Sequence, residues 1–112
     1  MQVWKMVVFG LVFVPALGFA DPTPQDQAKQ LMFEPTKGNC LACHKIVGGV
    51  FPGNIGPTLE GIQKRFKDRA QLRAQIYDAA GRNSDTVMPP FGRHGILTEK
   101  EIDLIADYLY TL

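Results

Sequence analysis

The chain has 112 residues, of which 46% are hydrophobic and 21% charged, a composition that is typical of one globular domain and argues against intrinsic disorder. It carries 12 basic and 11 acidic side chains, and loss of its first twenty residues would remove only Lys5 from this balance. A balanced charge gives no reason to expect a nucleic acid partner, because phosphates attract a basic surface.

The N-terminal segment has the order of features found in export signals. A weakly charged start at Lys5 is followed by an apolar run and, up to Ala20, by small residues. This order predicts a secretory signal peptide over residues 1–20 and a mature domain over residues 21–112, located in the oxidising periplasm. An uncleaved membrane anchor is the alternative, although the run is short and Pro15 interrupts it.

A short helix is predicted near the start of the mature segment. Its apolar face has three members, Ala28, Leu31 and Met32. We expect Pro35 and Gly38 to end this helix before Cys40. The following residues 48–57 are rich in Gly and Pro, which predicts a loop.

Two further helices are predicted in the middle of the chain. The first has apolar residues at helical spacing, Leu59, Ile62 and Phe66. In the second, Asp68 caps the N-terminus with Gln71 three residues later, and Gly81 ends the helix. Its apolar stripe consists of Leu72, Ile76, Ala79 and Ala80.

A loop and a final helix complete the chain. Two consecutive prolines exclude regular structure from residues 82–96. Thr98 and Glu101 predict a capping box for the last helix. Its buried stripe consists of Ile102, Ile105, Leu109 and Leu112. The sequence therefore predicts an all-α fold of three to four helices, with long loops that are expected to wrap a functional group.

The two cysteines of the chain stand in the segment CLACH. A disulfide between them would constrain little of the chain, and a redox dithiol of the thioredoxin type needs a βαβ context that is missing. Zinc would need Cys40, Cys43, His44 and His94 as its ligands. The C-x-x-C-H pattern is instead typical of haem attachment, which predicts one covalent haem c on Cys40 and Cys43 with His44 as an iron ligand.

Two downstream side chains are candidates for the second axial ligand of the iron. Met88 begins the segment MPPF in the proline-containing loop, and His94 lies six residues later. A thioether ligand raises the reduction potential and suits electron transfer, so the sequence favours Met88 over His94. An open iron site, as in a haem sensor or a peroxidase-like enzyme, is a third possibility.

The segments NCLACH and GPTLEGI, a methionine loop and a closing helix resemble the small class I cytochromes c over nearly all of residues 21–112. In that family the proline of the GP pair offers its carbonyl to the haem-ligating histidine, and Pro57 matches it, which implies a hydrogen bond to His44. A narrower resemblance is to the monohaem X subunits of sulfur-oxidising systems, SoxX. It is carried by GNCLACHKI, NIGPTLEGIQKRF and DTVMPPFGRHGILTEKEIDLIADYL.

The SoxX resemblance implies a role as an electron-transfer subunit. In that family the X subunit pairs with a haem protein, SoxA, and the SoxAX complex oxidatively joins thiosulfate to a cysteine of a carrier protein. The thiosulfate chemistry is assigned to the partner's haem, and the X subunit passes electrons to another cytochrome. No catalysis is expected from this chain alone, because no nucleophile–base pair or carboxylate pair is evident. A freely diffusing respiratory cytochrome is the alternative.

A basic run lies in the middle of the chain, at Lys64, Arg65, Lys67, Arg69 and Arg73. It could guide docking or neutralise haem propionates. A solvated helix surface is the more common arrangement for a basic cluster of this size.

Overall fold

The computed structural model describes residues 1–3 and 9–112. Its regular elements, in chain order, are α1 (Pro24–Phe33), the 3-10 turn η1 (Cys40–Ala42), α2 (Ile62–Arg65), α3 (Arg69–Tyr77), the 3-10 turn η2 (Ala79–Gly81) and α4 (Glu99–Leu109). Every regular element of this described part is helical. The predicted all-α architecture of three to four helices is therefore confirmed.

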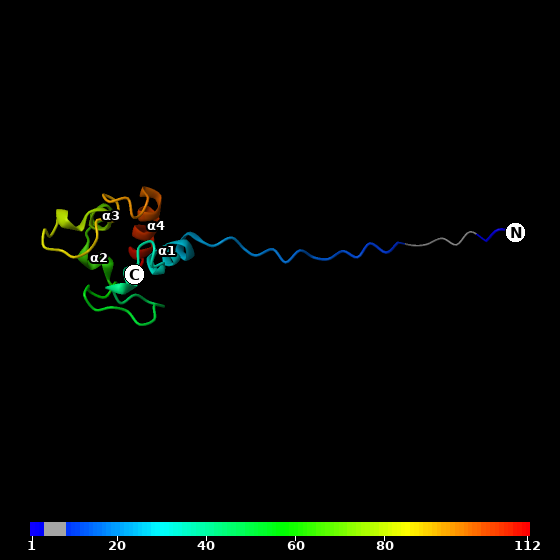
Figure 1. Ribbon diagram of the computed structural model, residues 1–112, viewed down its shortest axis with the longest axis horizontal. Helices are drawn as coiled ribbons and strands as arrows, with labels where there is room; N and C mark the ends of the chain where they lie inside the picture. The colour runs from blue at the N-terminus through cyan, green and yellow to red at the C-terminus, as the bar shows by residue number, and fades with distance from the viewer. Residues whose placement is uncertain (4–8) are drawn as a thin grey trace.

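The N-terminal part of the chain lies apart from the helical domain. Residues 9–23 run outward as an extended segment (Figure 1), and their apolar side chains are exposed, as at Phe13 and Phe19. Among the described residues, the helices are all too short or too polar to cross a bilayer. The hydrophobic core begins only with Ala28 in α1.

Capping boxes define the starts of α1 and α4. The Thr98 hydroxyl accepts a hydrogen bond from the backbone N–H of Glu101 at 3.2 Å, and the Glu101 carboxylate accepts one from the backbone N–H of Thr98 at 2.8 Å. This is the capping box predicted from the sequence. An equivalent box between Thr23 and Asp26 begins α1.

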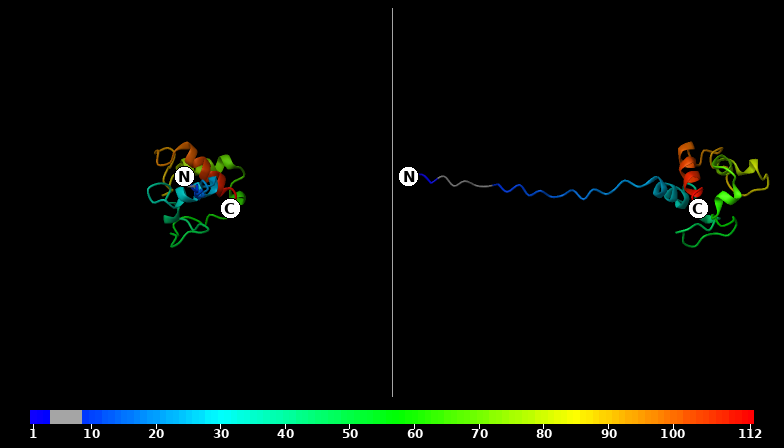
Figure 2. Two further views of the ribbon diagram at one scale, coloured as in Figure 1. Left: turned by 90° about the vertical axis from the view of Figure 1, so that its right-hand side faces the viewer. Right: turned by 180° about the vertical axis from the view of Figure 1, so that it is seen from behind.

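The core lies where α1 and α3 pack on α4 (Figure 2). Its fully buried large side chains are Met32, Ile62, Ile102 and Ile105. The predicted apolar stripes therefore face the core from α1 and α4, because residues three and four apart share one helix face. Leu112 lies beyond the end of α4 and is only partly buried.

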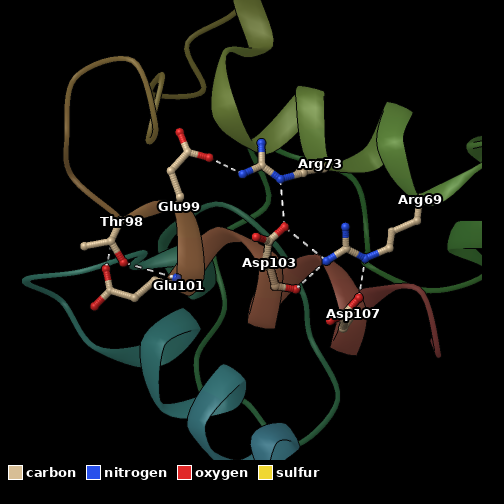
Figure 3. Close-up of polar contacts among 7 residues, drawn as sticks. All are labelled: Arg69, Arg73, Thr98, Glu99, Glu101, Asp103 and Asp107. Atoms are coloured by element: carbon tan, nitrogen blue, oxygen red, sulfur yellow. Dashed lines mark hydrogen bonds and ion pairs between the residues drawn. The ribbon is translucent and has the colours of Figure 1, made fainter.

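Ion pairs between partly exposed side chains join α3 to α4 (Figure 3). Asp103 accepts hydrogen bonds from Arg73 Nε at 2.7 Å and from Arg69 Nη2 at 3.1 Å. Arg69 also pairs with Asp107, and Arg73 with Glu99. Two arginines from one helix and three carboxylates from the other thus fix the position of α3 on α4.

Helix α3 is shorter than predicted. The sequence predicts an end at Gly81, but the helix stops at Tyr77, and the next residue, Asp78, has a non-helical backbone with φ −152° and ψ 89°. A longer helix would use the Tyr77 carbonyl oxygen for the N–H of Gly81. That oxygen instead accepts the backbone N–H groups of Gly92 and Arg93 at 3.1 and 3.2 Å. The backbone of the proline-containing loop thus binds the carbonyl oxygen that the next helical turn would need, and α3 ends at Tyr77.

Two neighbouring expectations also change. Ala80, placed in the buried stripe from the sequence, is exposed because the η2 turn rotates it away from the core. The predicted helix around Ile62 is a single turn, because Gly61 enters it with a left-handed φ of 58° and Phe66 leaves it extended. Phe66 still packs against the core from outside the helix.

Candidate functional site

One tight turn contains Cys40, Cys43 and His44, the three residues that the sequence predicts to attach haem and bind its iron. The backbone N–H groups of Cys43 and His44 both donate to the carbonyl oxygen of Cys40, at 3.2 and 2.9 Å. Asn39 enters this turn in the left-handed region, with φ 46°, which Asn adopts more readily than most residues. Both cysteines and the histidine therefore project from a single turn around η1.

This turn borders a cavity of about 450 Å³, a size within the range of cofactor sites, roughly 300–1,000 Å³. The predicted residues Cys40, Cys43, His44, Pro57 and Met88 all line it. Most of the remaining wall is apolar, formed by Ile55, Leu59, Ile62, Phe66, Leu72, Ile76, Val87, Phe91, Ile96, Leu97, Ile105 and Leu109. The cavity is therefore suited to a large apolar group.

The His44 imidazole is held from two sides by the loop that follows it. Its Nδ1 lies 2.7 Å from the carbonyl oxygen of Pro57, and because a carbonyl only accepts, Nδ1 carries the proton. In the neutral ring Nε2 is then the nitrogen with a free lone pair, which can bind a metal. Gly56 covers the ring, since a Cβ added there would lie 2.3 Å from Cε1 and 2.8 Å from Nε2.

Met88 reaches the cavity from the loop after α3. Its backbone N–H donates to the Thr86 hydroxyl at 3.1 Å, and its sulfur lies 3.7 Å from Nε2 of Gln75. The other candidate, His94, is exposed and is not among the residues that line the cavity. The fold thus brings Met88, but not His94, to the same cavity as His44.

Cys40 and Cys43 form no disulfide with each other. Burial in the apolar wall raises the pKa of the Cys40 thiol to about 11, so this thiol is protonated at neutral pH. Within the described part of the chain, no group of three or more His, Cys, Asp or Glu side chains converges on one point as a zinc site requires.

These donors fit a haem c. Two thiols on one turn can form two thioether bonds, an imidazole with a free Nε2 can bind iron, and a thioether sulfur can supply a second ligand. The apolar wall suits the porphyrin face. The glycine at position 56 leaves the space next to the imidazole that any side chain would fill.

Two residues of this site were missed in the sequence. Gly56 could have been found as the partner of Pro57 in the GP pair, because only glycine fits against the ring. Gln75 gives a weaker signal: it lies three residues after Leu72, on the edge of the apolar stripe, where a polar side chain can reach a cavity.

The basic run does not act as one patch. Arg69 and Arg73 are bound to carboxylates of α4, whereas Lys64 and Lys67 are exposed. Arg65 donates from Nη2 to the carbonyl oxygen of Thr58 at 3.1 Å and also lines the cavity. Two of the five side chains thus have a structural role on α3.

Comparison with known proteins gives matches that cover the helical domain, of which two are informative on the family and the fold. Residues 25–109 match the family described as cytochrome c oxidase, cbb3-type, subunit III. The fold is similar to a chain in the crystal structure of SoxXA from P. pantotrophus, with a TM-score of 0.70 and 29% identity over 81% of this chain and 82% of that chain. The predicted class I cytochrome c fold and the resemblance to SoxX are confirmed.

A further similar sequence is an uncharacterized lipoprotein of Aquifex aeolicus (strain VF5), which is 38% identical over 78 residues. The match covers 66% of this chain and 36% of that protein. The chain therefore spans about a third of the length of the curated relative it matches.

Proposed function

Since the chain belongs to the cbb3-type cytochrome c oxidase subunit III family, and is thus an electron-transfer c-type cytochrome with covalent haem c, we propose that its haem is bound by the CLACH segment. In this proposal Cys40 and Cys43 would form the two thioether bonds, and His44 and Met88 would bind one iron. The observation that carries it is the presence of all four side chains on one cavity, although Met88 lies 44 residues after His44.

Pro57 and the apolar wall of the cavity have distinct roles at this site. Pro57 keeps the proton on Nδ1 of His44 and orients the ring, so that Nε2 is available as a ligand. With haem bound, the apolar wall would limit the access of water to the metal and so lower the reorganisation needed when its charge changes. The haem supplies one-electron redox chemistry when bound.

Mass spectrometry of the exported protein tests this site. The expected product begins at Asp21 and carries the mass of one haem, and the Cys40→Ala/Cys43→Ala double variant carries none. Recovery of a colourless wild-type protein with only the mass of its amino acids would overturn the assignment. The N-terminal sequence in the same spectrum tests whether residues 1–20 are removed on export to the periplasm.

The finer proposal is that this cytochrome is the SoxX-like subunit of a two-protein complex. The structural similarity to a SoxXA chain at 29% identity supports it. In the proposed complex a SoxA-type haem protein joins thiosulfate to a carrier thiol: one S–S bond forms, the thiol loses its proton, and two electrons leave. This chain takes up the electrons one at a time and passes them to another cytochrome.

An exposed apolar loop beside the haem segment supports a protein partner. Its side chains are 65–98% exposed: Val47, Val50, Phe51 and Ile55. Phe51 also has a left-handed φ of 53°, which is rare for a bulky residue. Clustered exposed apolar side chains of this kind are typical of interaction surfaces.

Co-purification from cells grown on thiosulfate tests the complex. We expect a second haem protein to be retained by the wild-type chain, thiosulfate to reduce the haem only in the complex, and Phe51→Ser to weaken retention without loss of haem. A monomer that is reduced equally well without the partner would instead support the second candidate, a diffusing respiratory carrier. That candidate is favoured by the cytochrome c oxidase description of the matched family.

A further inference from the structure

The side chain of Gln75 contacts the proposed iron ligand Met88 from helix α3. Its Nε2 lies 3.7 Å from Met88 Sδ, a distance expected for a hydrogen bond to the large sulfur atom. Because a thioether sulfur accepts hydrogen bonds but cannot donate them, the Gln75 amide N–H is the donor. Both side chains line the cavity that also contains His44.

Both ends of this contact are held by the fold. Gln75 lies two residues after Arg73, whose Nε is 2.7 Å from Asp103, and it is followed directly by the buried Ile76. On the other side, the backbone N–H of Met88 is bound to the hydroxyl of Thr86 at 3.1 Å. The backbone at Gln75 and the backbone at Met88 are therefore each held in place by neighbouring contacts.

We infer that Gln75 is a positioning residue that orients the Met88 sulfur and raises the reduction potential of the haem, an inference that rests on the proposed function. A thioether sulfur has two lone pairs, of which one can bind iron while the other accepts the Gln75 N–H. The hydrogen bond selects the lone pair that faces the iron. It also withdraws electron density from the sulfur, so that Met88 is a weaker donor to Fe(III), and the reduced state gains stability.

Substitution of Gln75 by Leu in the holoprotein tests this role, with Gln71→Leu as the matched control. Gln71 is exposed, lies about one turn earlier on the same helix and does not line the cavity. We expect Gln75→Leu to keep its covalent haem but to have a lower reduction potential. The fall is equivalent to a roughly three- to tenfold change in the Fe(III)/Fe(II) ratio at a fixed ambient potential, the size of one net hydrogen bond.

One spectroscopic readout, the far-red band, separates positioning from a merely structural role. In Gln75→Leu the weak far-red band of the Fe(III)–methionine bond should shift or lose intensity, and in Gln71→Leu it should not change. If Gln75→Leu yields little folded protein, Gln75→Asn gives the same comparison, because its shorter side chain cannot reach the sulfur. A wild-type potential and an unchanged far-red band in either Gln75 variant would overturn the inference.

The failure of the proposed site gives a different result. A wild-type holoprotein without the far-red band, or a band that persists in Met88→Ala, would show that Met88 does not bind the iron. In that case the inference on Gln75 is overturned together with the site, because no iron-bound sulfur remains for it to orient. The two hypotheses are therefore separated by the wild-type and Met88→Ala spectra alone.

Discussion

The carbonyl oxygen of Pro57 lies 2.7 Å from Nδ1 of His44, and the residue before it, Gly56, covers the face of the same imidazole. One dipeptide thus holds the ring by an edge and by a face. The edge contact fixes the tautomer, and the face contact fixes the plane of the ring. Both are set by the polypeptide itself, so the histidine is oriented before any cofactor is considered.

Replacement of Gly56 by Ala should disturb this arrangement. The added Cβ would lie 2.3–2.8 Å from three ring atoms, so the ring must move away from Pro57. We expect the free energy of unfolding of the holoprotein to fall by about 1–3 kcal/mol, the usual cost of overpacking, and the iron–histidine bond to weaken. Denaturant titration and the Soret spectrum measure the two effects.

Gly81→Ala is the control for this change. A Cβ added at Gly81 meets no atom within 4 Å, so neither the stability nor the spectrum should change by a comparable amount. Equal stability of Gly56→Ala and the wild-type protein would contradict the close contact between Gly56 and the ring.

The choice between Met88 and His94 gives a second prediction. Met88 lines the cavity, whereas His94 is exposed on the loop that follows. Met88→Ala should abolish the far-red band of the Fe(III)–methionine bond, lower the reduction potential and allow carbon monoxide to bind the reduced iron. His94→Ala should match the wild-type protein in all three measurements. The reverse pattern would make His94 the ligand.

The cap of α4 gives a third prediction. The Thr98 hydroxyl accepts the backbone N–H of Glu101 at 3.2 Å at the start of α4, whose buried residues are Ile102, Ile105, Ala106, Tyr108 and Leu109. Thr98→Ala removes this acceptor and should lower the free energy of unfolding by about 1 kcal/mol, as is typical of N-cap deletions. Thr98→Ser retains the hydroxyl and should lose only a small part of this amount in the same urea titration.

The helices and the residues on the cavity were accessible from the sequence because local rules specify them. The capping box at Thr98 and the cap at Asp68 were both read correctly, since each depends on residues only three positions apart. The C-x-x-C-H segment is equally local. All five predicted site residues meet on one cavity, a convergence that the sequence alone could not establish for Met88.

Contacts between distant segments account for the main differences from the sequence prediction. The end of α3 was placed at Gly81 because the apolar spacing continues that far, but the Tyr77 carbonyl is used by Gly92. The sequence favours a solvated surface for the basic run over a docking or propionate role, and Lys64 and Lys67 are exposed. Arg69 and Arg73 instead each pair with carboxylates about 30 positions away. No local sequence pattern indicates such a distant partner. For the same reason, Gln75 could not be identified as a neighbour of the Met88 sulfur.

The ion pairs between α3 and α4 give a fourth prediction, on pH dependence. Hydrogen bonds from Arg73 and then Arg69 lower the pKa of Asp103 below its ordinary value of about 3.9. Since the folded pKa is the lower one, the stabilisation is complete above the unfolded pKa and is lost as the pH falls through the folded pKa. Because 43% of the side chain is exposed, Asp103→Asn should cost only about 0.5–1 kcal/mol at neutral pH.

Unfolding of the wild-type and Asp103→Asn holoproteins over a range of pH measures this contribution. The difference in stability between the two proteins should be constant above about pH 5 and should decrease as the pH falls through the lowered pKa of Asp103. It should also be smaller in high salt. Asp85→Asn, which removes an exposed loop carboxylate outside the ion pairs assigned in the described residues, should show no such difference. A constant gap down to acid pH would mean that Asp103 acts through packing. In that case the ion pairs would not fix the position of α3, and of Gln75 within it, on α4.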